Sequence, residues 1–439
     1  MKSNRGGKYY ERASKNNFYK YKRYKNVCHG AIKINTIKEI ESEEFKDNSS
    51  ILGIYGQNGS GKSAVIDATH ILKYLIKWEK LPDDIDSLIN FGSKAAMLEY
   101  SFYVKSDEFE GIIDYKFEIV KSDDNGYIVD YEKLSIKKLD EGKWSRKNTL
   151  FEIRNGEIRY SKIKNMISKG TRMFLRVLYD NKAGESMLFG NRLNERVRND
   201  LFEKGEWELP FVVDVLKKFA INNLSIIRNG EARIFKSDSN GKCIIKVSDF
   251  DSLKRNIEQL GNIIECIVPS MKIDISIEKE KLLDNGEKRM IIEFISVKEG
   301  YSIPLIYESK GIKRIVPIIN YLIKLYNNES MCLVIDDFDL GINEYLFGEL
   351  VKIFDMSAKG QLIFTSNNFR ALEMMSYKKF VFTTTNPDNK YIRLHGVGED
   401  NPRDFYYSSI LLGGQEEELY DETRNYRIER AFRMCRNNK

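Results

Sequence analysis

The sequence predicts an α/β fold organised around a phosphate-binding loop that joins a buried strand to a helix. The predicted strand is the apolar run at residues 51–55, and an unbroken apolar run is typical of a strand buried on both faces. From residue 64 to residue 76, apolar residues recur at helical spacing. Between the two stands a complete G-x-x-x-x-G-K-S pattern, which reads Gly56, Gln57, Asn58, Gly59, Ser60, Gly61, Lys62 and Ser63. Strand, loop and helix in this order predict a nucleotide-binding core rather than an ordinary glycine-rich turn.

The fixed positions of this loop have chemical reasons. Glycine at three positions permits positive φ, so that backbone N–H groups can surround phosphate oxygens. Lys62 can reach the β- and γ-phosphates of a nucleotide, and the Ser63 hydroxyl can bind Mg²⁺. The helix that follows adds the positive end of its dipole. No N-K-x-D pattern supports GTP, so we predict ATP and Mg²⁺ as the cofactors.

Composition narrows the class of protein. The chain has 439 residues, a length that allows two or three domains. With 42% hydrophobic and 31% charged residues, it can form a folded protein with a large core. A net charge of +6 permits a basic patch but does not by itself indicate a nucleic-acid-binding protein. The five cysteines and three histidines are scattered and predict no zinc site. Without an apolar leader or a membrane-length apolar run, a cytoplasmic location is expected.

The N-terminal strands contain a run of alternating basic and aromatic residues at 18–25. Such a run could bind nucleic acid through stacking and charge. The interpretation we favour is an amphipathic edge strand whose lysines prevent edge-to-edge pairing. A third possibility is that Arg23 or Lys25 contacts the nucleotide.

Two segments follow the predicted core helix. Residues 97–163 alternate apolar and polar side chains between glycine-containing turns, which predicts an antiparallel meander. Residues 165–260 are more charged and mostly helical in pattern, with several arginines. A solvated helical face is the simpler explanation of those arginines, and a surface for nucleic acid or a partner is the alternative. They are Arg172, Arg176, Arg192, Arg196 and Arg198.

A second strand of the nucleotide-binding core ends in two acids. Residues 331–335 are apolar, and Asp336 and Asp337 follow them directly. The carboxyl ends of parallel strands are where an open α/β sheet binds its ligand. We therefore predict Asp336 as the second Mg²⁺ ligand and Asp337 as the residue that orients the hydrolytic water, with Lys62 the third catalytic residue.

The order of these motifs resembles the ATP-binding-cassette (ABC) ATPases, and within them the heads of chromosome-maintenance (SMC), DNA-repair and OLD-type proteins. The resemblance implies an ABC-type head with an antiparallel β lobe, a helical insertion and a C-terminal extension. It also implies that Ser309 and Gly311, in Glu308-Ser309-Lys310-Gly311, form the signature that contacts the nucleotide of a second protomer. Two sites would then form only in a homo-oligomer, at least a dimer. The Leu412-Gly413-Gly414-Gln415 string follows the acidic strand, so we expect it to have a structural or partner-binding role instead.

Three departures from that family imply slow hydrolysis. Asp337 occupies the position where the family usually has glutamate, and Asn367 the position where it usually has histidine. The family also has a glutamine ligand in the first lobe, the Q-loop, but here no glutamine occurs between Gln57 and Gln259. The implied lobes are residues 1–164 and 261–390, with the insertion at 165–260 and the extension at 391–439.

The loop at 53–62, the acidic strand and the tail at 405–423 are more specifically similar to the ATPase subunits of PARIS anti-phage systems and to AbiL-type abortive-infection ATPases. This similarity implies an oligomeric sensor that restrains a separate toprim-type nuclease effector until it meets a phage protein. The alternative is a DNA-binding repair or recombination ATPase, in which the basic segments would contact DNA.

Overall fold

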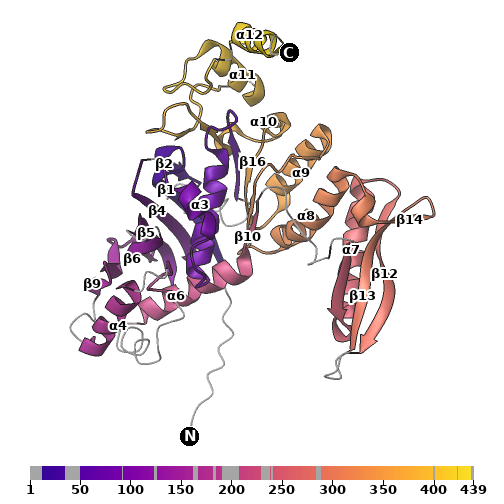
Figure 1. The fold of residues 1–439 in the computed structure, drawn as a ribbon. Coiled ribbons are helices and arrows are strands. Elements are labelled where there is room, and N and C mark those ends of the chain that lie inside the picture. Colours follow the sequence, from indigo (N-terminus) through magenta and orange to yellow (C-terminus); the bar gives the residue numbers. More distant parts are fainter. Residues whose placement is uncertain are drawn as a thin grey trace.

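The computed structural model describes residues 12–34, 50–90, 92–122, 126–161, 167–180, 184–189, 207–228, 238, 241–282, 288–398, 401–422 and 424–436. These residues form three sheets with helices between and beside them (Figure 1). No helix among them is both long and apolar enough to cross a lipid bilayer.

The central sheet has the strand order β10-β15-β16-β3-β17-β18. Its first five strands run parallel, and only β18 pairs antiparallel with its neighbour. The bounds are β10 Leu224–Ile227, β15 Cys332–Ile335, β16 Gln361–Thr365, β3 Ser50–Tyr55, β17 Phe380–Thr383 and β18 Tyr391–Ile392. Every residue of β3, β15, β16 and β17 is buried, as expected when both faces of a parallel sheet are covered.

The two faces of the central sheet belong to two hydrophobic cores. Successive side chains of a strand point to opposite faces, so Leu52 joins one core and Ile51 the other. The first core contains helix α3 (Lys62–Ile76), and the second contains α8 (Lys310–Asn327), α9 (Glu344–Ser357) and α10 (Arg370–Met374). The phosphate loop therefore lies at the end of a strand that is fixed on both sides.

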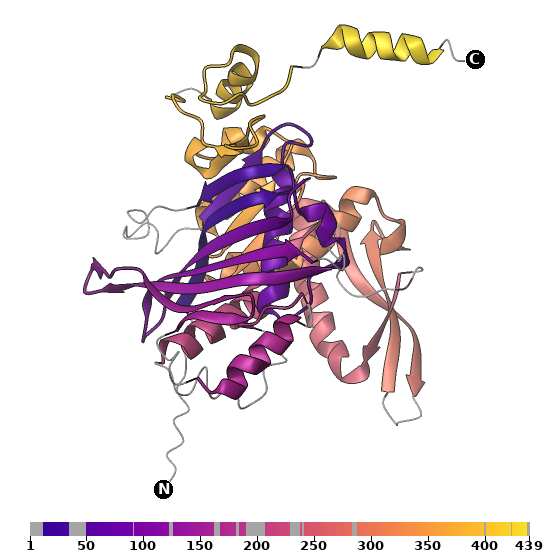
Figure 2. The ribbon, with the colours of Figure 1, turned by 60° about the vertical axis from the view of Figure 1, so that its left-hand side comes forward.

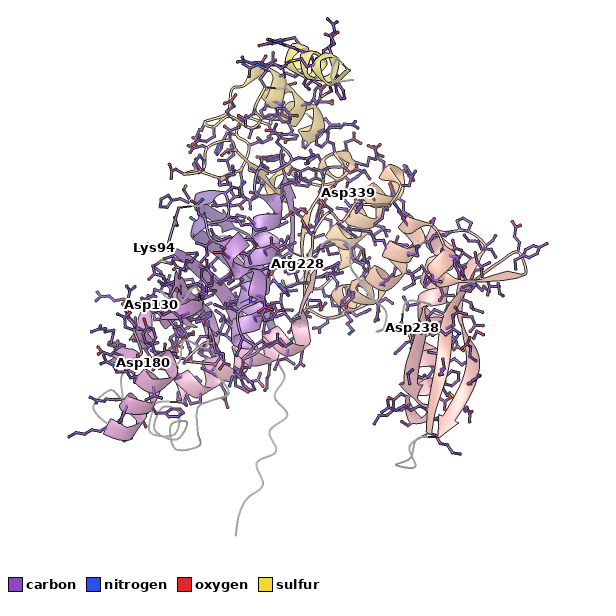
Figure 3. All side chains as sticks on the ribbon, viewed as in Figure 1. Lys94, Asp130, Asp180, Arg228, Asp238 and Asp339 are labelled. Atoms are coloured by element: carbon purple, nitrogen blue, oxygen red, sulfur yellow. The ribbon has the colours of Figure 1, made fainter. Side chains whose placement is uncertain are left out.

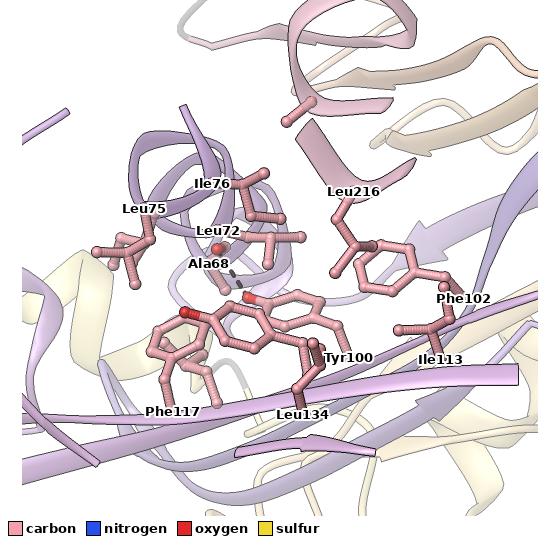
Figure 4. Close-up of a cluster of buried hydrophobic side chains, with 14 of the residues drawn as sticks. Ala68, Leu72, Leu75, Ile76, Tyr100, Phe102, Ile113, Phe117, Leu134 and Leu216 are labelled. Atoms are coloured by element: carbon pink, nitrogen blue, oxygen red, sulfur yellow. Dashed lines mark hydrogen bonds between the residues drawn. The ribbon is translucent and has the colours of Figure 1, made fainter. Parts of the chain in front are cut away.

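An eight-stranded antiparallel sheet covers the other side of α3, as the alternating pattern predicts. Its order is β2-β1-β4-β5-β6-β8-β9, with β7 paired to β6. The strands are β1 Arg12–Tyr24, β2 Val27–Lys33, β4 Ala95–Lys105, β5 Glu110–Lys121, β6 Tyr127–Asp140, β7 Lys143–Trp144, β8 Asn148–Arg154 and β9 Glu157–Ser161. Figure 4 shows Tyr100 of this sheet packed against α3, where its hydroxyl donates a 2.7 Å hydrogen bond to the carbonyl of Ala68.

The edge-strand interpretation of residues 18–25 is wrong. β1 pairs with β4 on one side and with β2 on the other, so β2 is the outer strand. The local pattern could not reveal this, because β1 becomes an interior strand through its pairing with β4, which is distant in sequence. The side chains of residues 18–23 lie outside the described part of the structure.

The range expected to be a mostly helical insertion contributes to the central sheet as well. It holds α4 (Lys169–Asp180), α6 (Glu208–Lys218) and α7 (Phe250–Ile267), but also β10, which pairs parallel with β15. β10 follows α6 after a π-helical turn at Phe219–Asn223, and a strand of four residues is too short to interrupt a helical pattern visibly. Arg192, Arg196 and Arg198 lie outside the described residues.

The third sheet is antiparallel and stands at one side of the molecule with α7 packed on it (Figure 1). Its strands are β11 Lys242–Lys246, β12 Met271–Leu282, β13 Lys288–Lys298 and β14 Tyr301–Pro304. The chain then enters α8, which leads back into β15. At the C-terminal end, α11 (Pro402–Leu412) packs against the body through Tyr406, and α12 (Asn425–Arg436) extends away from it (Figure 2).

Candidate functional site

The phosphate loop has the backbone that its glycines predict. Gly56, Gly59 and Gly61 all have positive φ, at 148°, 77° and 108°. At Gly56 there is also no room for a side chain, because a Cβ would lie 1.7 Å from Thr383 Oγ1. No other heavy atom of the described chain lies within 4 Å of a Cβ at Gly59, so glycine there serves the conformation alone.

Distant segments hold the loop in this shape. Asn26 Nδ2, in the turn between β1 and β2, donates a 2.6 Å hydrogen bond to the carbonyl of Gly59. Tyr391 Oη donates a 2.9 Å bond to the carbonyl of Gly61. The Ser60 and Thr383 hydroxyls lie 2.5 Å apart. Residues far from the loop in sequence, on both sides of it, therefore fix its shape.

Lys62 lies along the loop rather than in solvent. Its Nζ donates hydrogen bonds of 2.7 Å to the carbonyl of Gly56 and 3.2 Å to that of Gln57. Burial lowers the pKa of Lys62, while the charges of Asp337, Asp336 and Asp339 oppose that change. The ammonium group thus lies between the loop and the acidic strand end.

The acidic strand end meets the loop at Asp336. Asp336 Oδ1 accepts a 3.1 Å hydrogen bond from Ser63 Oγ and a 2.6 Å bond from Thr365 Oγ1. The backbone N–H of Asp337 donates to the same Thr365 hydroxyl at 2.8 Å. Burial and the neighbouring Asp337 raise the pKa of Asp336 above its usual range. Three elements that are distant in sequence thus converge on one carboxylate.

Arg314 holds the backbone of the two acids in place. The sequence did not predict this role. This buried residue of α8 donates from Nη2 to the carbonyl of Asp336 at 3.0 Å and also to the carbonyl of Asp337. Asp337 has a φ of 47°, in the left-handed region that is uncommon for non-glycine residues, although aspartate tolerates it better than most. An arginine in a helix otherwise rich in apolar residues was the available signal.

Asp67 of α3 forms ion pairs with two basic side chains. Lys25 Nζ forms an ion pair with one of its carboxylate oxygens, and Arg228 Nε lies 2.7 Å from the other. Arg228 Nη1 also lies 2.7 Å from His70 Nδ1, and burial together with Arg228 lowers the pKa of His70 to about 4. Arg228 directly follows β10 and is labelled in Figure 3.

A cavity of about 1080 Å³ extends from the phosphate loop along the turn at Lys25. Its lining includes seven of the predicted site residues: Asn58, Gly59, Gly61, Lys62, Ser63, Asp337 and Asn367. Its far wall was not predicted and comes from the connection after α3 and from the large antiparallel sheet: Asp86, Ser87, Ile89, Asn90, Gly92, Ser93, Lys94, Lys121 and Tyr127. Lys25, one of the alternatives considered for contact with the nucleotide, also lines it.

Ser309 and Gly311 do not reach this cavity within one chain. Ser309 caps the N-terminus of α8, where its Oγ accepts a 3.3 Å bond from the backbone N–H of Ile312. Gly311 packs against backbone, since a Cβ there would lie 2.3 Å from the carbonyl oxygen of Gly341. Close packing therefore accounts for glycine at 311 within a single chain.

The C-terminal extension also contacts the loop. The Gln57 side chain forms a pair of hydrogen bonds with the backbone of Asp421: Asp421 N–H donates to Oε1 at 3.0 Å, and Nε2 donates to the carbonyl at 3.4 Å. Gln415, of the Leu-Gly-Gly-Gln string, forms the same kind of pair with the backbone of His395, at 3.0 and 3.2 Å. The first pair fastens the extension to the body, and the second holds two parts of the extension together.

The parallel strand β3 leads into a glycine-rich loop and helix, and Asp336, which follows β15 two strands away in the same sheet, accepts a hydrogen bond from the loop serine. This arrangement defines a mixed α/β P-loop NTPase fold. This is the fold class that the sequence predicts.

Comparisons with known proteins give structural neighbours only. No protein-family model matches the chain, and no curated protein matches it. It is similar to an Smc head bound to the C-terminal winged-helix domain of ScpA, with 14% identity, a TM-score of 0.42, and coverage of 87% of this chain and 98% of that one. The SMC head domain from Thermotoga maritima is 13% identical, with a TM-score of 0.38 and coverage of 87% of this chain and 99% of that one. The recombination mediator RecF is 12% identical, with a TM-score of 0.35 and coverage of 82% of this chain and 94% of that one. At these values the function must be argued from the chain's own site.

We expect Asp336→Asn to stabilise the ligand-free protein. The raised pKa means that the charged form is disfavoured in the folded state, and asparagine removes that charge while keeping an acceptor for Ser63 and Thr365. The free energy of unfolding at neutral pH, measured by urea denaturation without nucleotide or Mg²⁺, should rise by roughly 1 kcal/mol. Because Asp336 becomes neutral below its folded-state pKa, the gain should disappear on acidification. The exposed Asp107→Asn should leave stability unchanged, and a loss of stability in Asp336→Asn would contradict this account.

Proposed function

We propose that this chain binds ATP with Mg²⁺ in the cavity beside the phosphate loop and hydrolyses it. The observation that carries the proposal is the hydrogen bond from Ser63 Oγ to Asp336 Oδ1, which brings a loop hydroxyl and a strand-end carboxylate to one point. Mg²⁺ prefers oxygen ligands and is usually held by one or two carboxylates together with substrate phosphates and water. Ser63 and Asp336 fit that donor set. The described residues hold no group of three or more His, Cys, Asp or Glu that would form a complete protein cage for a metal.

The roles of the other residues follow from their positions. The backbone of residues 56–63 surrounds the phosphates, and Lys62 exchanges its carbonyl contacts with Gly56 and Gln57 for phosphate oxygens. When bound, Mg²⁺ neutralises charge on the phosphates. Asp337, on the cavity wall, orients the attacking water, and Arg314 positions Asp337 through its backbone carbonyl.

Hydrolysis is proposed to be slow. Efficient activation of water needs a carboxylate within hydrogen-bonding reach of the water. Asp337 is one methylene shorter than the glutamate usual in ABC-type ATPases, and Asn367 on the cavity wall cannot act as a base as a histidine can. ATP would then mark a state of the protein more than supply energy.

We further propose a homo-oligomer in which Ser309 and Gly311 contact the nucleotide of a second protomer. Ser309 is exposed at the N-terminus of α8, and a helix N-terminus favours phosphate. Arg314, in the same helix, donates to the carbonyls of both acids, so a phosphate bound at the start of α8 is mechanically linked to the acids of its own chain. Residues 1–164 and 261–390 would act as the two ATPase lobes, joined by β10 from the segment between them.

The biological role we propose is a sensor in anti-phage defence that controls a separate toprim-type nuclease effector and responds to a phage protein. It is supported by the resemblance of the phosphate loop, acidic strand and tail to the ATPases of such systems, and by the fastening of that tail to Gln57. The second candidate is a DNA-binding repair ATPase. It is favoured by the basic and aromatic residues at 18–25.

Lys62→Ala should abolish ATP binding. Loss of the ammonium group removes the direct charge partner of the phosphates while the loop keeps its glycines. In wild type, Mg²⁺-ATP at about 100 times its dissociation constant should stabilise the fold by about 2.7 kcal/mol, seen as a rise in melting temperature. The variant should show no rise. Lys80→Ala, an exposed lysine just beyond α3, should behave as wild type, and an undiminished rise in Lys62→Ala would refute the assigned site.

Asp337→Glu should raise the hydrolysis rate by at least about tenfold, because a longer side chain brings the carboxylate closer to the attacking water. Phosphate release at saturating ATP measures it. Asp337→Asn, which keeps the length but removes the charge, should fall below wild type. If all three proteins turn over equally slowly, the chain is an ATP-binding scaffold.

The biological role is tested by affinity purification from cells that express the native locus, with Mg²⁺-ATP and with nuclease-treated controls. We expect a stoichiometric second protein that carries its own acidic nuclease motif and stays bound after DNA digestion. Purified chain should show no DNA-stimulated hydrolysis. Recovery of DNA alone, with salt-sensitive affinity and stimulated turnover, would instead establish the repair ATPase.

A further inference from the structure

The C-terminal extension carries an exposed apolar stripe on α11. One side of this helix packs on the body through the buried Tyr406 and Ser409. The opposite side presents Tyr407 and Leu411, one turn apart, and the adjoining Leu412. Leu411 is 66% exposed and Leu412 86%, although both are large and apolar. Side chains of this kind at helical spacing are typical of a contact surface.

Helix α12 carries a second stripe. Ile428, Ala431, Phe432 and Cys435 follow the i, i+3, i+4, i+7 spacing that places side chains on one face. All four are exposed, with Ile428 at 46% and Phe432 at 76%. The helix stands clear of the rest of the described chain (Figure 2). A short helix with such a face is stabilised mainly by packing against something else.

The two segments that contain these helices have opposite net charge. Residues 402–422 contain six acidic residues and one arginine, whereas residues 424–436 contain five arginines and one glutamate. Net charges of −5 and +4 follow for the two segments. On α11 itself only Arg403 and Asp404 are charged, and the other five acidic residues lie at 416–422, just after the helix. Arg427 and Arg430 lie on α12 outside its apolar face. The apolar stripes lie on helices of similar length, 11 and 12 residues, and the acidic segment that follows α11 complements the basic α12.

We propose that α12 of one copy of this chain binds α11 of a second copy, and that the exchange is reciprocal. The segment between the helices argues against a fold-back within one chain. It is fastened at Gln415 to His395, at Glu418 to the backbone N–H of Thr385, and at Asp421 to Gln57. Only residues 422–424 separate the last of these contacts from α12, and the helix extends away from the body (Figure 2).

A reciprocal exchange forms a two-fold symmetric dimer in which the same contact occurs twice. Each contact is about 18 Å long at 1.5 Å per helical residue. The contact residues lie outside the cavity lining, so this association does not need nucleotide and is distinct from the assembly proposed around Ser309.

Sedimentation velocity of the full-length, nucleotide-free chain tests the exchange through a mixing experiment. Phe432→Glu damages α12 and leaves α11 intact, and Leu411→Glu does the reverse. Each variant alone should associate at least about tenfold more weakly than wild type, because every contact in its dimer holds a buried glutamate. An equimolar mixture should recover dimer, since one of its two contacts pairs an intact α12 with an intact α11. Association of wild type should also weaken as salt rises.

Ile353→Glu is the matched control, because Ile353 is 49% exposed on α9 and lies outside both stripes. It should associate as wild type, and circular dichroism should verify that all variants fold. Three results would each overturn the proposal. A monomeric wild type would show that α12 does not bind a second copy, and a dimer that Leu411→Glu does not weaken would indicate that α12 pairs with α12. The third is a mixture that associates no more strongly than either variant alone. Lys62→Ala should dimerise normally, so failure here is distinguishable from failure of the ATP site.

Discussion

The rest of the site depends on the hydrogen bonds that the buried Asp336 carboxylate accepts. This carboxylate is buried at the end of β15, and its Oδ1 accepts hydrogen bonds from Ser63 after β3 and from Thr365 at the end of β16. An unpaired buried carboxylate would be strongly destabilising, so the three strand ends must stay in register for the charge to be tolerated. The same register brings Lys62 and Asp337 to one cavity. The fold thus accepts an unfavourable charge at the place where a divalent cation would make it favourable.

The supports of this site come from the parts of the chain most distant in sequence. Asn26 and Tyr391, from opposite ends of the chain, hold the carbonyls of Gly59 and Gly61, and Arg314 holds those of Asp336 and Asp337. Each donor occupies a backbone acceptor, which fixes the loop and the strand end without using the side chains that would meet a ligand. Preorganisation of this kind lowers the cost of ordering the site when ligand binds.

The sequence predicted those features that local chemistry determines. Gly56, Lys62 and Ser63 are recognisable because spacing and residue type within eight residues specify the loop, and Asp336 is recognisable because it ends an apolar run. Arg314, Asn26 and Asp67 were not, since their importance comes from contacts across the fold. The status of β1 as an interior strand and the place of β10 in the central sheet were missed for the same reason: strand neighbours are set by long-range pairing, which periodicity does not encode.

The contact of Gln57 with Asp421 gives the C-terminal extension a physical connection to the proposed nucleotide site. Gln57 lies inside the phosphate loop, and its amide is paired with the backbone only four residues before α12 begins. A loop that shifts around a phosphate must carry Asp421 with it or break that pair. Either result changes the direction in which α12 leaves the body, because few residues intervene. Energetic coupling between sites requires an element that both sites can bias, and the segment from Gln415 to Asp421 connects the loop contact to α12. Binding of nucleotide and binding of a second copy through α12 should therefore influence each other reciprocally, as linkage demands.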